Sequence, residues 1–134
     1  MKKYSFVFLI LLWSACSSPE KRIQWITLDP GHFHAALVQK TMYPEINPEV
    51  HVYGTSSADL DLHLNRIEAY NQRDENPTSW KSVVYDKEDF YERFKKEAKG
   101  SVVMLSGNNK KKTEYILNAI ENGFHVYADK PMVI

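Results

Sequence analysis

Short apolar segments alternate with helix-forming segments along most of the chain. Five apolar segments, most of them rich in β-branched residues, have the length of buried strands: residues 23–28, 50–53, 80–85, 101–106 and 126–128. Segments of helix-forming composition lie between them: residues 35–40, 60–71, 87–97 and 113–122. This alternation predicts βαβ units with right-handed crossovers. We therefore expect an α/β fold with a doubly wound parallel sheet of Rossmann type over residues 23–134.

Local signals predict where the helices begin and end. Ser57 or Asp59 is expected to cap the second helix, and Asp86 the third. Gly123 is expected to end the fourth helix, whose apolar stripe is Tyr115, Ile116, Ala119 and Ile120. The basic cluster at residues 110–112 is interpreted as the solvated start of that helix.

The N-terminus has the layout of a secretory signal. Lys2 and Lys3 precede an apolar stretch at residues 4–13, and Ser14 and Ala15 then precede Cys16. This pattern predicts a lipoprotein-type signal peptide at residues 1–15, a lipidated Cys16 and a polar tether at residues 16–22. The protein would then be exported to the cell envelope and anchored to the membrane through Cys16. The alternative is an ordinary cleaved signal with an incidental cysteine.

The charge balance excludes one class of partner. The chain has 17 basic and 17 acidic residues, so it offers no electrostatic footprint for nucleic acid. Its single cysteine allows no disulfide within the chain.

The turn after the first predicted strand reads Asp29-Pro30-Gly31-His32-Phe33-His34 and has three interpretations. Gly31 could let the backbone approach a pyrophosphate, with His32 and His34 donating to the phosphates or pairing with Asp29. Alternatively, His32 and His34 are two metal ligands, as in metal-dependent hydrolases. The third interpretation is a surface loop in which the histidines have no special role.

Three further positions at predicted strand ends are candidate cofactor contacts. Thr55 follows the second strand, where an acid would hold ribose hydroxyls, so the choice between NAD and NADP stays open. Ser106 and Asn108 follow the fourth strand and either contact a nicotinamide ribose or form only a turn. Lys130 ends the fifth strand and is made rigid by Pro131; it is either catalytic or paired with Asp129 at the surface.

The segment from Gly123 to Pro131, GFHVYADKP, resembles the G-K-H-V-x-x-E-K-P segment of the glucose–fructose oxidoreductase, inositol dehydrogenase and MocA family (Gfo/Idh/MocA). The resemblance implies a sugar or polyol substrate and NAD or NADP as cofactor. It implies that Lys130 hydrogen-bonds the substrate hydroxyl and helps its proton leave as hydride moves to the cofactor. It also implies that Gly31 lies in the phosphate loop, and that Pro131 and the Ser106-Gly107-Asn108 turn lie beside the cofactor.

In that family a sixth strand and a C-terminal α+β domain follow the Lys-Pro pair. This domain supplies most substrate contacts and commonly mediates oligomers, so a homo-oligomer is expected only of a full-length protein. None of it is present in the 134 residues, and we expect this chain to be inactive as a dehydrogenase on its own.

Three functions are therefore open. The first is the N-terminal part of an exported sugar oxidoreductase, including the variant in which bound NAD is used catalytically to cleave glycosidic bonds. The second is a non-catalytic nucleotide- or sugar-binding lipoprotein, or a truncated remnant. The third is a metal-dependent hydrolase built on His32 and His34.

Overall fold

A computed structural model describes residues 22–107 and 109–129. The predicted signal peptide and Cys16 lie outside these residues and stay predictions. Among the described residues, five parallel strands form one sheet in the order β3-β2-β1-β4-β5. Their bounds are Trp25–Leu28 (β1), Glu49–Tyr53 (β2), Lys81–Tyr85 (β3), Val102–Leu105 (β4) and His125–Ala128 (β5). The predicted parallel α/β sheet is confirmed, and its order is Rossmann-like.

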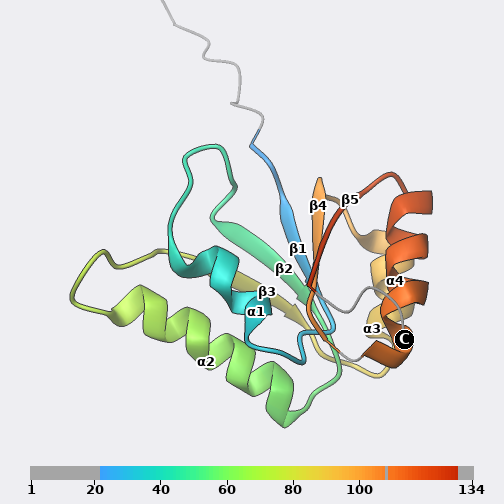
Figure 1. Ribbon diagram of the computed structural model, residues 1–134, viewed down its shortest axis with the longest axis horizontal. Helices are drawn as coiled ribbons and strands as arrows, with labels where there is room; N and C mark the ends of the chain where they lie inside the picture. Colours follow the sequence, from blue (N-terminus) through green and yellow to red (C-terminus); the bar gives the residue numbers. More distant parts are fainter. Residues whose placement is uncertain (1–21, 108, 130–134) are drawn as a thin grey trace, which may run out of the picture.

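The helices cover both faces of this sheet (Figure 1). They are α1 (His34–Leu37) with the 3₁₀ turn η1 (Val38–Lys40), α2 (Ala58–Gln72), α3 (Phe90–Glu97) and α4 (Asn109–Glu121). Figure 1 shows α1 and α2 on one face and α3 and α4 on the other. No helix within the described ranges is long and apolar enough to cross a membrane.

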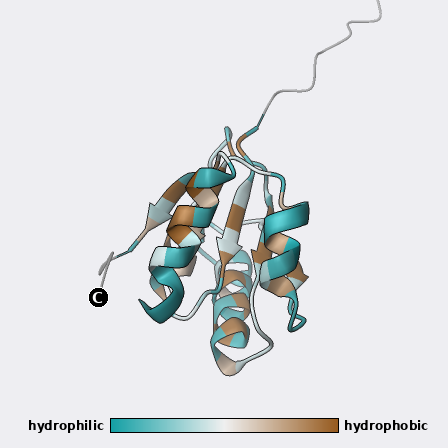
Figure 2. Ribbon diagram, turned by 90° about the vertical axis from the view of Figure 1, so that its right-hand side faces the viewer, coloured by the Kyte–Doolittle hydropathy of each residue, from teal (hydrophilic) through white to brown (hydrophobic). Residues whose placement is uncertain are grey.

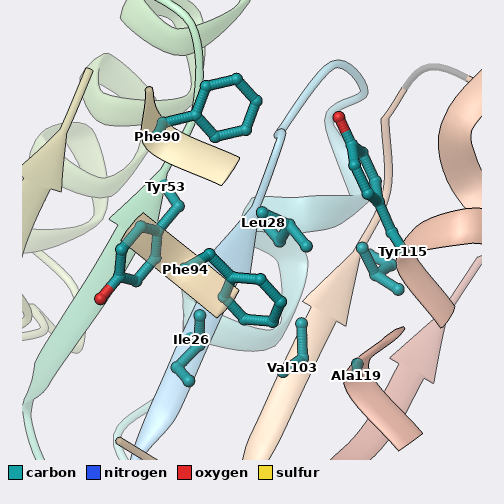
Figure 3. Packing of buried hydrophobic residues seen from close by; sticks show 9 residues of the cluster. Ile26, Leu28, Tyr53, Phe90, Phe94, Val103, Tyr115 and Ala119 are labelled. Carbon is teal, nitrogen blue, oxygen red and sulfur yellow. The ribbon is translucent and has the colours of Figure 1, made fainter. Parts of the chain in front are cut away.

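Two apolar clusters, one on each face, hold the layers together. Nine buried residues from the sheet and from α3 and α4 form the first cluster, and most of them are seen in Figure 3: Ile26, Leu28, Tyr53, Phe90, Phe94, Val103, Leu105, Tyr115 and Ala119. Under α1 and α2 lie seven more: Ala36, Ile46, Val50, Val52, Leu60, Ile67 and Trp80. Burying one aliphatic side chain completely contributes about 2 kcal/mol to the free energy of folding, so these two clusters stabilise the packing of the helices on the sheet. Each helix in Figure 2 carries both hydrophobic and hydrophilic residues, as expected of helices with one buried face.

Three helix predictions need correction. The third helix begins at Phe90 rather than after Asp86, because residues 86–89 form a turn in which the amide of Phe90 donates to the Lys87 carbonyl at 2.9 Å. The fourth helix begins at Asn109, four residues earlier than predicted, which brings the lysine cluster into its first turns. Ile120 does not belong to its buried stripe, because 57% of its surface is exposed.

Two predicted helix ends are confirmed. The Ser57 hydroxyl accepts a hydrogen bond from the amide of Leu60 at 3.4 Å, so Ser57 caps α2. Gly123 follows α4 with φ +81°, a left-handed conformation that favours glycine.

Candidate functional site

The carboxyl ends of four strands bring together the polar residues that the sequence singled out. β1 and β4 are neighbours in the sheet although they are not consecutive in the chain, so the strand order reverses between them. In open α/β sheets ligands bind outside the carboxyl ends of the strands at such a switch point. Asp29, Ser106 and Asp129 follow β1, β4 and β5 at this edge.

The turn after β1 is tied to the turn after β4. The amides of Gly31 and His32 both donate to the Ser106 carbonyl, each at 3.0 Å. Asp29 has φ +49°, and its carbonyl oxygen lies so close to Gly107 that a Cβ there would be 1.9 Å away. Gly107 is therefore required for the two turns to approach each other. Because the Gly31 and His32 amides are already used, they are not free to donate to a phosphate in this structure.

A pocket of about 430 Å³ lies on one side of these joined turns, toward β2. Backbone from Gly31, Gly54 and Gly107 forms part of its wall. The side chains lining it are mostly polar: Asp29, Thr55, Ser57, Asp59, Lys111 and Tyr115, with Pro30, Leu60 and Phe90. We call it the switch-point pocket.

Asp29 and Tyr115 are neighbours in the wall of this pocket. The Tyr115 hydroxyl, visible in Figure 3, donates to Asp29 Oδ2 at 3.3 Å. Burial raises the pKa of Asp29, and the Tyr115 hydrogen bond only partly offsets it. Burial and the neighbouring carboxylate likewise raise the pKa of Tyr115.

A second pocket, of about 350 Å³, lies on the other side of the joined turns. It is lined by Gly31, His32, His34, Gly107, Asn109, Lys112 and Asp129. We call it the histidine pocket. Since Gly31 and Gly107 line both pockets, only the joined turns separate the two.

The Asp129 carboxylate is the common partner of the polar groups in the histidine pocket. Its Oδ1 accepts from Lys112 Nζ at 2.5 Å, and its Oδ2 accepts from the Ser106 hydroxyl at 2.7 Å. His34 Nδ1 lies 3.3 Å and His32 Nδ1 3.7 Å from the same Oδ2. Partial burial opposes ionisation, but the hydrogen bonds from Lys112, Ser106 and His34 hold the pKa of Asp129 below its ordinary value.

These contacts correct two interpretations. The histidines do not pair with Asp29, because both face Asp129, which comes from the far end of the chain. Lys112 does not belong to a solvated helix start: its side chain is 3% exposed and is turned inward to Asp129. The Asp129 carboxylate at the end of β5 thus stabilises Lys112 in a buried position, although lysine side chains are usually exposed.

The structure brings most of the predicted site residues to this edge of the sheet. Gly31 and His32 lie in the turn after β1, and His34 is the first residue of α1. Thr55 lines the switch-point pocket, and Ser106 is buried against Asp129. Asn108, Lys130 and Pro131 lie outside the described residues, so their predicted roles stay predictions. Sequence reasoning proposed no site role for several lining residues, among them Lys111, Lys112 and Tyr115. Lys112, Tyr115 and Ala119 are three and four residues apart and so share one helix face. This spacing was a signal that Lys112 and Tyr115 are turned inward.

His63 lies next to the site, in a smaller pocket with His32 and Arg66. Its side chain is 3% exposed, and neither ring nitrogen has a hydrogen-bond partner among the described residues. Burial, reinforced by the Arg66 guanidinium, lowers the pKa of His63 to about 4 from 6.5.

This burial predicts a pH-dependent stability. The unfolded chain binds a proton at His63 below about pH 6.5, whereas the folded chain resists it down to about pH 4. The free energy of unfolding should therefore fall with decreasing pH in this window, by about 2 kcal/mol between pH 7 and pH 5. Urea unfolding of wild type and His63→Leu at both pH values measures it. An equal pH dependence in the two proteins would show that His63 does not cause it.

Comparisons with known proteins bear on the fold of this region. No protein-family model matches the chain. No curated protein matches it either. The structure is similar to the crystal structure of a "putative oxidoreductase from Parabacteroides merdae ATCC 43184", with a TM-score of 0.83 and 50% sequence identity. The match covers 86% of this chain and 26% of that protein, so the chain spans about a quarter of its solved relative. This portion of the two proteins has the same α/β, Rossmann-like fold.

Proposed function

We propose that this chain is the N-terminal, nucleotide-binding part of an oxidoreductase. The observation that carries the proposal is the switch-point pocket, which lies where Rossmann-like sheets bind dinucleotides. The similarity to a solved "putative oxidoreductase" supports the same class. The resemblance of residues 123–131 to the Gfo/Idh/MocA segment extends the proposal to hydride transfer between NAD(P) and a sugar or polyol.

The residues of the switch-point pocket fit the adenosine half of such a cofactor. The backbone of Gly31, Gly54 and Gly107 lies in the wall of this pocket, so that part of the wall carries no side chain. Asp59 and Thr55 lie at the β2 side, where ribose hydroxyls are bound in this fold. Lys111 supplies a cation for the phosphates, a role we assign to it because the Gly31 and His32 amides are already engaged.

The histidine pocket would then receive the nicotinamide end and the substrate. NAD(P) bound there would supply the hydride acceptor, and the proton of the substrate hydroxyl would have to leave to a base of the protein. Lys130, the residue after Asp129, is our candidate for that base, by the family resemblance. Within the described residues, Ser106 and Lys112 hold Asp129 and so fix the end of β5 from which Lys130 follows.

Titration of the purified chain with NADH and NADPH, followed by nicotinamide fluorescence, tests this proposal. We expect saturable binding of at least one cofactor. Asp59→Asn should raise the affinity for NADPH relative to NADH about fivefold, because it removes the repulsion between a carboxylate and a 2′-phosphate. Asp61→Asn is the matched control, since Asp61 lies in the same first turn of α2 but does not line the pocket.

Two results would count against the proposal. A folded chain that binds neither cofactor would exclude nucleotide binding by this portion of the protein. An affinity ratio that changes equally in Asp59→Asn and Asp61→Asn would remove Asp59 from the ribose site.

A further inference from the structure

We propose that His32, His34 and Asp129 form a binding site for a divalent transition-metal ion, with Zn²⁺ the ion best suited to the donors. Two imidazole nitrogens and one carboxylate oxygen are a common protein donor set for zinc. The donor atoms of these three residues lie within 4.8 Å of one another. The three residues line the histidine pocket, where the proposed function places the nicotinamide end and the substrate, so this inference adds a metal ion to that part of the site.

The spacing of the donor atoms matches a metal centre. A tetrahedral zinc ion with bonds of about 2.0–2.1 Å keeps its ligand atoms about 3.3 Å apart. His34 Nδ1 and His32 Nδ1 lie 3.3 and 3.7 Å from Asp129 Oδ2. The histidine side chains are 47% (His32) and 38% (His34) exposed, so small rotations can complete the geometry.

Hydrogen bonding alone explains this arrangement less well. Charge-assisted N–H···O bonds are about 2.7–2.9 Å long, and both histidine distances are longer. Both imidazoles also converge on the one carboxylate oxygen that the Ser106 hydroxyl already occupies at 2.7 Å. A cation between the two imidazoles and Oδ2 would satisfy all three groups together.

The surroundings of Asp129 are those of an oriented metal ligand. Ligating carboxylates are usually held by hydrogen bonds from outer-shell residues. Here Lys112 donates to Oδ1 and the Ser106 hydroxyl donates to Oδ2, and Oδ2 also faces the two histidines. The Lys112 charge weakens the binding of any cation at this site, so we expect moderate rather than tight affinity.

The site would keep an open coordination position. Three protein ligands leave a fourth position of a tetrahedral ion for water or substrate. The three residues line a pocket of about 350 Å³, large enough for a small oxygen-bearing molecule. A ligand in this position would bind the ion through a water, hydroxyl or carbonyl oxygen, which the ion would polarise.

Equilibrium dialysis of the purified, tag-free chain against Zn²⁺ tests the proposal, with Co²⁺ absorption as a second readout. We expect about one ion per chain and the visible bands of four-coordinate cobalt. His34→Ala and Asp129→Asn should each weaken Zn²⁺ binding more than tenfold. His125→Ala is the matched control, because His125 is exposed at the opposite end of β5 and should leave binding unchanged.

Circular dichroism confirms that each variant is folded, and His32→Ala provides a second test at a more exposed side chain. Absence of stoichiometric Zn²⁺ and Co²⁺ binding by the folded wild type would overturn the proposal. So would binding that survives in all three ligand variants. An NADH titration of the metal-free protein measures nucleotide binding without the ion, so a failure of the metal proposal is distinguishable from a failure of the proposed function.

Discussion

Replacing Gly107 with alanine is expected to lower the free energy of unfolding by roughly 3 kcal/mol and to abolish ligand binding in both pockets. The new Cβ would lie 1.9 Å from the carbonyl oxygen of Asp29, and a backbone atom cannot move aside as a flexible side chain can. The turns after β1 and β4 must then separate. Urea unfolding and the NADH titration measure the two effects.

Gly123→Ala is the matched control. Gly123 has φ +81° but nothing within 4 Å of its added Cβ, so only the conformational cost of about 1 kcal/mol is expected. A loss in Gly107→Ala no larger than in Gly123→Ala would mean that the two turns are not in such close contact.

The second large effect is expected from Asp129→Asn, which should lower the free energy of unfolding by about 3 kcal/mol. The substitution keeps the size of the side chain but leaves the Lys112 ammonium, 3% exposed, without its counter-charge. Urea unfolding with a metal chelator present measures the change and keeps metal binding out of the comparison. The double variant Lys112→Met, Asp129→Asn should regain most of the loss, because no buried charge remains.

The pH dependence of that difference is a further check. The pKa of Asp129 is held below its ordinary 3.8, so its contribution is fully present above about pH 4 and is lost as the pH falls further. The difference between wild type and Asp129→Asn should therefore be present at neutral pH and shrink as the pH falls below about 4. A difference below 1 kcal/mol at neutral pH would show that Lys112 reaches solvent.

The strands and their parallel arrangement were predictable because each buried strand is a short apolar run between turn residues. All five predicted strands are present within two residues of their predicted ends. The helix starts were less predictable. A lysine cluster opposes the positive end of the helix dipole, which favoured a later start for α4. The contact of Lys112 with Asp129, 17 residues away, turns this lysine inward from the first turns of α4, and local pattern does not report it.

The candidate site was predictable in its parts but not in its grouping. Gly31, Thr55 and Ser106 could be identified because they follow β1, β2 and β4, and the carboxyl ends of parallel strands share one edge of the sheet. The partner of the histidines was not predictable from local pattern, since His34 and Asp129 are 95 residues apart. Their contact depends on β4 and β5 pairing in register, which a single sequence does not report.

The Ser106 carbonyl, which accepts from both Gly31 and His32, has a thermodynamic consequence for the two pockets. These bonds join the turns after β1 and β4 into one unit, so neither pocket can change shape without moving a wall of the other. If a ligand in one pocket favours one position of the joined turns, it changes the affinity of the other pocket for its ligand. That second ligand then changes the affinity of the first pocket by the same factor. Occupancy of the ribose side and occupancy of the histidine side are thus linked variables rather than independent events.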